Sequence, residues 1–368
     1  MALSKIQGIE GQVTPNLGRR NLIINGAMQV AQRATTFDYN TPSGNLYTTV
    51  DRFALYKSTG TYEVTNTQST DAPVGFSHSY KLVCDTAYTP SASDNFGINQ
   101  NIEVSSGLQR FGFGTSEAKD ITFSFYVKGT PKTYTFQANY VGTDGEQKTQ
   151  MKSFAVTNTW TRKVITFSAG GTSSSVGIEP DLTSQGFNFR VWLAGGSDDI
   201  SSEITTWTAN PSPTYKAVTG QGNFFSDVGN EFSITGVQLE VGDTATEFEH
   251  SSFIDELRRC KRYYNSSYSY GVVAGTANTT TSIGHMSRGG SYNIIGQFFH
   301  PASMRANPTI VVYSPLNGTV NQLRGDGSSF AGAAVLHNSP DGATFYVNGV
   351  TITETVFLSC HATFSAEL

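Results

Sequence analysis

One stretch decides how this sequence folds: residues 236–264, GVQLEVGDTATEFEHSSFIDELRRCKRYY. Residues 232–242 alternate apolar and polar side chains, which predicts a strand that closes a β domain. A polar connector follows at 243–250, and Ser252 with Asp255 three residues later has the spacing of a helix N-cap and capping box. The stretch therefore predicts a junction, in which a β domain ends and one short helix forms within residues 250–265.

The predicted helix has one apolar face and a favourable arrangement of charges. Its apolar residues recur at i, i+4, i+7 and i+11: Phe253, Leu257, Cys260 and Tyr264. Asp255 and Arg259 are four residues apart with the acid first, which is the favourable order. A helix of about 12 residues is marginal alone in water. The apolar face therefore needs a covering surface, either the neighbouring β domains or the same helix in other copies of the chain, where it would form a trimer interface.

On both sides of the junction the composition predicts β structure. Charged residues make up 14% of the 368 residues, well below the usual quarter, and aromatic residues make up 12%. In ITFSFYVKG, residues 121–129, Ile121, Phe123, Phe125 and Val127 share one face of a strand. We expect an all-β protein, in which an antiparallel jelly-roll or β-sandwich domain and a smaller C-terminal β-sandwich domain are joined by one short helix.

Similar runs locate the expected strands and divide the chain. Strands are predicted at 22–24, 47–56, 80–85, 121–129, 133–142, 161–169, 187–196, 232–242, 291–301, 308–315, 333–339, 342–350 and 353–366. The expected domains are an N-terminal segment 1–20, a first β domain 21–249, a connecting helix 250–265 and a C-terminal β domain 266–368. On composition alone, residues 1–20 are either a disordered tail or an anchor that orders on a partner.

Charge and cysteine usage exclude several classes of function. The formal net charge is -5 and no basic block occurs, which argues against a nucleic-acid partner. The three cysteines, Cys84, Cys260 and Cys360, form no CxxC pair, so we expect reduced, buried thiols. The N-terminus lacks the apolar core of a secretory signal, and no apolar run is long enough for a membrane span.

Residues 237–264 resemble a segment that is widespread in bacteriophage fibre and tail-appendage proteins. There a V-Q-L-E-x-G strand precedes A-T-x-F-E-x-R and a helix E-L-x-x-C-x-R-Y-Y, which Leu257, Cys260, Arg262, Tyr263 and Tyr264 match. Further pieces are similar to the same group: MALSKI at the start, RRNLIINGAMQVAQR (19–33), DRF (51–53), MRANPTIVVYS (304–314) and FSAEL (364–368).

The resemblance implies a virion protein with a carbohydrate-binding-module-like jelly roll, made in the host cytoplasm and commonly homotrimeric. We expect a tail fibre that attaches to a host surface glycan, with residues 1–20 anchoring it to other virion proteins. A capsid-attached head fibre or decoration protein is the alternative, and a polysaccharide-degrading tailspike is a second. The family implies attachment without catalysis.

Aromatic side chains are the candidates for glycan binding, because sugar rings stack on exposed aromatic faces. Four are predicted: Trp207, Trp160, Tyr140 and Tyr88. Trp192 lies in an apolar run and is predicted to be core. Related carbohydrate-binding modules hold calcium through a carboxylate at the position of Gln29, whose amide makes a poor substitute.

Catalytic signatures do not support an enzyme. No G-x-S-x-G or H-E-x-x-H occurs, and the six histidines have no metal-ligand spacing. We therefore expect no metal, no cofactor and no catalytic residues, and we expect His300 to be a packed histidine.

Overall fold

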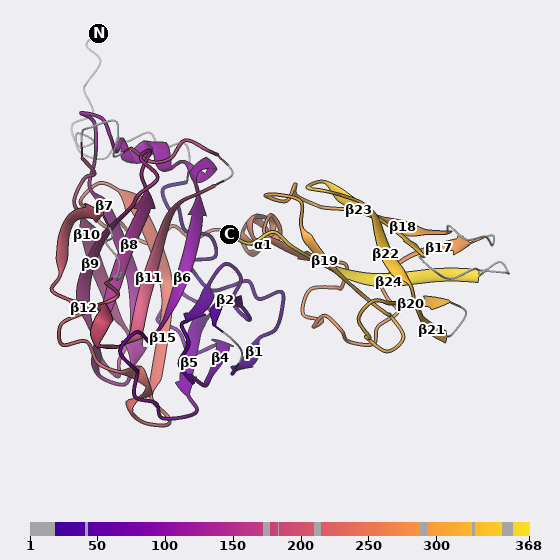
Figure 1. The fold of residues 1–368 in the computed structure, drawn as a ribbon, viewed down its shortest axis with the longest axis horizontal. Coiled ribbons are helices and arrows are strands. Elements are labelled where there is room, and N and C mark those ends of the chain that lie inside the picture. The colour runs from indigo at the N-terminus through magenta and orange to yellow at the C-terminus, as the bar shows by residue number, and fades with distance from the viewer. Residues whose placement is uncertain are drawn as a thin grey trace, which may run out of the picture.

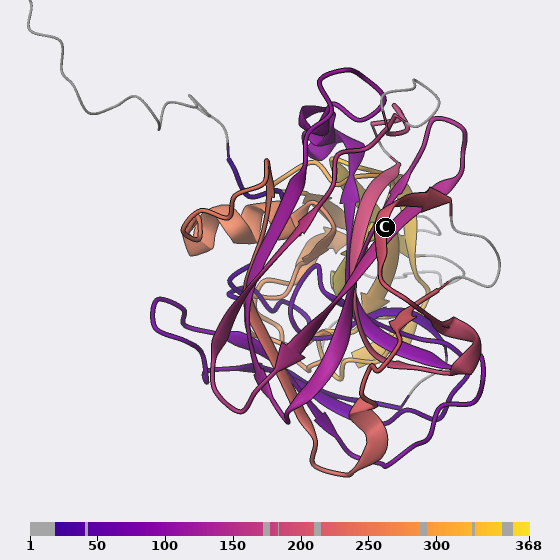
Figure 2. The same ribbon diagram turned by 90° about the vertical axis from the view of Figure 1, so that its left-hand side faces the viewer.

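The computed structural model describes residues 19–40, 43–171, 177–182, 184–209, 215–287, 293–325, 328–347 and 356–368. The chain forms two β domains arranged end to end, with helix α1 (Phe253–Lys261) between them (Figure 1). Viewed from the first-domain end, the second domain lies behind the first (Figure 2). Within the described residues there is one α-helix, so the expected all-β class is confirmed. The predicted anchor lies outside the described residues, apart from Arg19 and Arg20.

The first domain is a sandwich of two antiparallel sheets. The six-stranded sheet has the order β1 (Thr36–Tyr39), β4 (Val64–Ser69), β5 (Ser79–Cys84), β15 (Glu231–Val241), β7 (Ile121–Gly129), β10 (Thr161–Phe167). The seven-stranded sheet has the order β13 (Ile204–Ala209), β9 (Gln147–Val156), β8 (Lys132–Val141), β11 (Gln185–Gly195), β6 (Asn95–Glu103), β3 (Ala54–Lys57), β2 (Gly44–Tyr47). A short parallel pair, β12 (Ile200–Ser201) and β14 (Ala217–Val218), accompanies them.

Aromatic rings fill the space between the two sheets. The predicted apolar face of β7 points inward, and its four residues are fully buried. From the opposite sheet Phe136 stacks on Phe125, with ring centroids 5.1 Å apart, and on Phe189, with centroids 5.4 Å apart. Burying one such side chain contributes about 1.5–3 kcal/mol, so this aromatic layer is a main source of the domain's stability.

The central strands β8, β11 and β6 of the seven-stranded sheet are buried on both faces, which the sequence patterns did not indicate. Every residue of β6 is buried, although alternate residues are polar. On the face away from the core, Asn139 donates to Asn188 Oδ1 at 2.8 Å and accepts a hydrogen bond from Thr149. Because these amides satisfy one another, polar strands such as β6 and β9 can be interior strands.

Two predicted strands are wrong. Residues 47–56 divide into the end of β2, a turn at 48–53 and β3, because Arg52 adopts a positive φ of 72° that ends the extended run. Residues 22–24 form no strand. They lie beside the sheet instead. Leu22 N donates a hydrogen bond to Leu239 O at 3.1 Å, and Ile24 N donates one to Gln100 Oε1 at 3.0 Å.

The second domain is built around its last strand. β24 (Val356–Ser365) pairs with β16 (Tyr264–Ser266), β17 (Ile283–Ser287), β19 (Thr309–Tyr313) and β20 (Gln322–Gly325), and β20 pairs with β21 (Ser328–Ala331). A three-stranded sheet has the order β18 (Asn293–Phe299), β23 (Gly342–Val347), β22 (Ala333–Ser339). Phe364 joins the two layers: its ring stacks on Phe298 with centroids 4.8 Å apart and meets His300 edge-on at 4.6 Å. His300 is thus a packed histidine, as expected.

The cysteines and the helix dimensions complete this description. Cys84, Cys260 and Cys360 are free and buried. No described helix is long and apolar enough to cross a membrane.

Candidate functional site: the joint between the domains

Helix α1 begins where the sequence predicts and ends earlier. The Ser252 side chain accepts from Asp255 N at 3.2 Å and donates to the Asp255 carboxylate at 2.7 Å, which confirms the N-cap. The helix ends at Lys261, so Tyr264 belongs to β16 and not to the helix. The expected pair of Asp255 with Arg259 is replaced by an ion pair of Glu256 with Arg259 at 2.8 Å.

The buried face of α1 is turned by about one residue from the predicted face. Glu256 and Cys260 are buried, Leu257 is half-buried, and Phe253 is 39% exposed. Cys260 packs with Ile24, Val30 and Tyr263 of the same chain. Residues of the first domain therefore cover the helix at Cys260.

Glu256 determines this orientation, because its carboxylate binds the loop at the start of the first domain. It accepts from Asn25 N at 2.6 Å and pairs with Arg19 at 3.3 Å. Asn25 has a positive φ of 59°, which asparagine tolerates better than most residues. The Asn25 amide closes the loop by exchanging hydrogen bonds with the Val30 backbone, each 2.9 Å long, and donates to Asp51 O at 2.9 Å.

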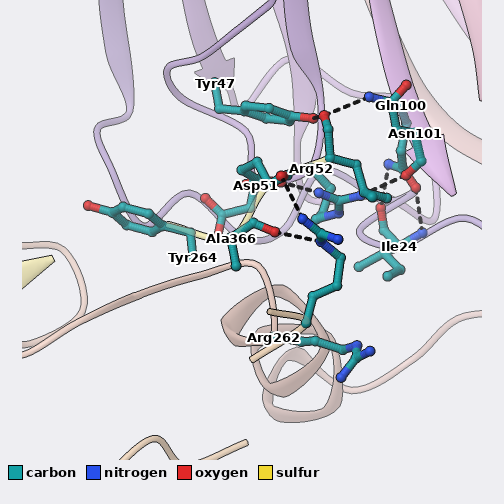
Figure 3. Close-up of polar contacts among 12 residues, drawn as sticks. Ile24, Tyr47, Asp51, Arg52, Gln100, Asn101, Arg262, Tyr264 and Ala366 are labelled. Atoms are coloured by element: carbon teal, nitrogen blue, oxygen red, sulfur yellow. Dashed lines mark hydrogen bonds and ion pairs between the residues drawn. The ribbon is translucent and has the colours of Figure 1, made fainter. Parts of the chain in front are cut away.

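Arg52 is the centre of the contact between the domains (Figure 3). Its side chain is 1% exposed, and its guanidinium pairs with the Glu367 carboxylate and donates to Asn101 O at 2.7 Å. The guanidinium also lies 3.5 Å from the ring centroid of Tyr263, in cation–π geometry. A buried charge is tolerated only when it is paired and hydrogen-bonded, and Arg52 meets both conditions.

Arg33 adds a second cation to the same contact. It lies 3.1 Å from Glu367, 3.7 Å from Asp51 and 3.7 Å from the ring centroid of Tyr264. Gln32 donates to the Asp51 carboxylate and to Tyr264 O, the latter at 2.9 Å. These charge-assisted contacts connect the first domain to the start of β16.

Residues 366–368 return to the helix, where the C-terminal end lies beside α1 (Figure 1). Ala366 N donates to Tyr263 O at 2.8 Å, and Arg305 Nε donates to Ala366 O at 2.9 Å. Leu368 O accepts from Asn101 Nδ2 at 2.8 Å. We call this whole assembly the joint: residues 21–33, 47–52, 99–103, 256–264, 305 and 366–368.

The Asp51 carboxyl gives the joint a titration in the acidic range, and its sign is definite. Burial raises the pKa of the Asp51 carboxyl to about 6, against the lowering effects of Arg33 and of hydrogen bonds from Gln32. The folded protein therefore binds a proton at Asp51 between about pH 6 and pH 4, where the unfolded chain does not. This group contributes stability that is fully present below about pH 4 and is lost as the pH rises through 6.

We predict that the stability difference between wild type and Asp51→Asn depends on pH. Wild type should gain on the order of 1–3 kcal/mol relative to the variant as the pH falls from neutral to about 4. Melting temperatures of both proteins across this range test it, and all other carboxyls titrate in both proteins and cancel. A difference that stays constant with pH would contradict the perturbed titration of Asp51.

The four predicted glycan-binding residues do not form one surface. Trp207 and Tyr140 are in contact, with centroids 4.9 Å apart, but Tyr140 is 1% exposed and belongs to the core. Trp207 is half-buried, and its Nε1 donates to Ser168 O at 2.7 Å. Tyr140 therefore offers no face to a sugar, and the ring of Trp207 serves mainly to cover the sandwich edge.

The other two predicted residues lie apart from this pair. Trp160 is half-buried and donates to Asp71 at 3.1 Å, beside Lys128. Tyr88 donates to Asp94 at 2.5 Å, and its ring meets Tyr62 with centroids 4.9 Å apart. Both side chains are held by contacts within the first domain.

Trp192 is fully buried, but on the opposite face of the sheet from the sandwich core. It meets Tyr56 edge-on at 5.6 Å and donates to Gln137 at 2.8 Å. Arg190 lies against both rings, 5.3 Å from the centroid of Tyr56 and 5.4 Å from that of Trp192. The alternation of Asn188, Arg190 and Trp192 was the sequence signal for this face. It was not used, because residues 187–196 were predicted as an apolar strand.

No metal site is evident in the described part of the chain. Among those residues no group of three or more His, Cys, Asp or Glu side chains could hold an ion. Gln29, at the position implied for calcium, is half-buried and lines a small pocket with Glu249 and Glu256.

Comparison with known proteins shows distant structural similarity only. No protein-family model matches the chain, and no curated protein matches it. The enzymatically active domain of tailspike protein 4 of bacteriophage CBA120 is 13% identical at a TM-score of 0.31, over 60% of this chain and 21% of that one. The chain thus spans about a fifth of the length of that protein.

Several other similar structures are carbohydrate-binding modules. The family 11 module of the cellulosomal cellulase Lic26A-Cel5E of Clostridium thermocellum is 11% identical at a TM-score of 0.29, over 56% of this chain and 99% of that one. The tandem CBM22-1-CBM22-2 domain of Paenibacillus barcinonensis Xyn10C is 8% identical at 0.27, over 92% and 97%. Similarities this distant carry no functional inference.

Proposed function

We propose that this chain is a structural appendage protein of a bacteriophage virion, a homotrimeric tail fibre that attaches to a glycan on the host cell surface. The sequence resemblance to phage fibre proteins supports the class of protein. The joint supports the structural role, and it is the observation on which the proposal chiefly depends.

The sequence pieces from residue 19 onward that resemble phage fibres are far apart in the chain, yet they meet at the joint. Segment 19–33 supplies Asn25 and Arg33, the DRF triplet supplies Asp51 and Arg52, and segment 304–314 supplies Arg305. The helix motif contributes residues 256–264, and FSAEL contributes residues 366–368. The residues that resemble those of phage fibre proteins thus hold the two domains in one orientation.

A fixed orientation suits a protein that spans the distance between a particle and a cell. Ion pairs withdrawn from water hold their geometry because separating them would leave a buried charge unpaired. The N-terminal segment would bind the virion, the first domain would act as a spacer or glycan-binding module, and the second domain would trimerise and meet the host. In this proposal the chain has no catalytic function.

Labelling of phage particles tests the proposal. Gold-conjugated antibodies against the second domain should bind at the tail, and the purified protein should sediment at three times the chain mass. Particles made with a chain lacking residues 1–18, which keeps Arg19 and its ion pair with Glu256, should lose the label while that protein melts like wild type. Label on the capsid would favour the head fibre, and absence of label on any particle would refute a virion protein. Release of reducing ends from host polysaccharide would instead favour the tailspike.

A further inference from the structure

Basic side chains from separate parts of the chain line a groove beside the joint. The groove has a volume of about 580 Å³, and its charged lining residues are Arg19, Arg110, Arg259, Arg262 and Glu103. An adjoining groove of about 470 Å³ shares Arg110, and its other charged lining residues are Arg20, Lys119, Glu240 and Asp243. The start of the described chain, in indigo, lies beside the orange helix α1 here (Figure 2). We call the two hollows together the arginine groove.

The carboxylates nearby do not neutralise the arginine groove. Glu103 is shared by Arg262 at 3.0 Å and Arg305 at 3.8 Å. Glu256 is likewise shared by two arginines, Arg19 at 3.3 Å and Arg259 at 2.8 Å. Glu103 and Glu256 therefore each face two guanidinium groups. Glu240 and Asp243 balance Arg20 and Lys119 in the smaller hollow, so the positive excess lies in the hollow of about 580 Å³. This excess contrasts with the net charge of -5 of the whole chain.

Arg110 is held in place by groups that leave its charge uncompensated. Its Nε donates to Gly107 O at 3.2 Å and its Nη1 to Arg19 O at 3.0 Å, and both acceptors are backbone carbonyls. Gly107 has a φ of 92° and turns the chain between η1 (Val104–Ser106) and η2 (Leu108–Phe111), so that Arg110 folds back over it. Arg110 is half-buried, and its guanidinium is thus pre-positioned at the place where both hollows meet.

The remaining lining residues suit a sugar. Ser105 and Ser106 add hydroxyl groups to the groove of about 580 Å³, which falls within the range of about 300–1,000 Å³ typical of ligand sites. Guanidinium groups bind carboxylate and phosphate through paired hydrogen bonds. We propose that the arginine groove binds an acidic glycan, in which a carboxylate or phosphate pairs with Arg110 and sugar hydroxyls meet the serines. This inference rests on the proposed attachment function and names its ligand class.

The charge distribution favours an acidic glycan over a polyanion of dense charge. A nucleic acid carries a phosphate every few ångströms, and the net charge of -5 of the chain opposes its approach. A polysaccharide with about one acid per sugar unit can place single acids in the groove.

Binding of defined polymers to the full-length protein tests the inference. The probes are polygalacturonic acid, glycerol teichoic acid, neutral dextran and poly-L-glutamate, measured by calorimetry. Wild type should bind one or both acidic glycans, more weakly at high salt, and should bind neither dextran nor polyglutamate. Binding of only one acidic glycan identifies the acid as carboxylate or phosphate.

Variants locate the site. Arg110→Gln should weaken binding about tenfold or more, because a hydrogen bond between charged groups contributes about 1.5–3 kcal/mol. Lys119→Gln, at the exposed rim, should weaken it less. The matched control is Lys132→Gln, which removes the same charge at the opposite end of the β7–β8 hairpin and should bind like wild type.

Three results would overturn the inference: no binding to either acidic glycan, equal binding to polyglutamate, or unchanged binding by Arg110→Gln with an unchanged melting temperature. Each is separate from the virion test. A chain found on the tail that ignores acidic glycans would refute the ligand class and leave the appendage function standing.

Discussion

Replacing Arg52 with alanine should lower the free energy of unfolding by about 3–5 kcal/mol, which is the usual cost of removing one partner of a buried ion pair. The variant leaves the Glu367 carboxylate beside Arg33 alone, removes the cation from the ring of Tyr263 and leaves Asn101 O without its donor. Thermal melts of the intact protein measure the loss. Because Arg52 joins the domains, small-angle scattering should also show a wider range of domain orientations.

Two variants control this experiment. Arg258→Ala removes an exposed arginine of α1 and should change stability by no more than about 0.5 kcal/mol. The double variant Arg52→Met with Glu367→Leu should recover much of the loss, since apolar residues of similar size often replace a buried pair without cost. A single variant Arg52→Ala as stable as wild type would show that the pair does not hold the domains together.

Replacing Gly26 with alanine should cost about 3 kcal/mol or more, because the position has no room for a side chain. A Cβ atom there would lie 2.1 Å from Val237 O, which is backbone of a central strand and cannot turn aside. The loop would have to move and would lose the bond from Val237 N to Gly26 O, now 2.9 Å long. Chemical denaturation measures the loss.

Gly145→Ala is the matched control for this substitution. Gly145 has a φ of 76° and open space around it, so alanine there meets only the backbone penalty of about 1–2 kcal/mol. Equal losses of stability at the two glycines would show that the loop at 25–30 rearranges at little cost and does not stabilise the joint.

The elements predicted well were those that depend on interactions between residues close together in the sequence. β7 spans the predicted 121–129, because alternate large apolar residues can be buried together only on one face of a strand. The N-cap at Ser252 is likewise a contact across three residues. The helix end was predicted too late because Tyr264 continues the apolar spacing, while its backbone pairs with Ser365 of β24, about a hundred positions away.

Polar strands and the binding surface were predicted poorly for one reason. β6 was not among the predicted strands, and in the structure its Asn99 donates to Asn101 Oδ1 while Asn101 donates to Leu368 O, which is distant in the sequence. Among the predicted glycan-binding residues, Tyr140 is buried because Phe113 and Trp207, from distant parts of the chain, pack against its ring. Burial of a particular side chain depends on what covers it, and local pattern does not contain that information.

By itself the sequence determined the β class, the position of the junction and the capped start of its helix, because each follows from residue spacing within a single segment. Only the tertiary structure decided the joint and the arginine groove. Arg52 and Glu367 are 315 positions apart, and the groove gathers arginines near residues 19, 110 and 260 from a chain with no basic block. Electrostatic contacts depend on distance in space, so charges that look scattered along the chain can become one site when it folds.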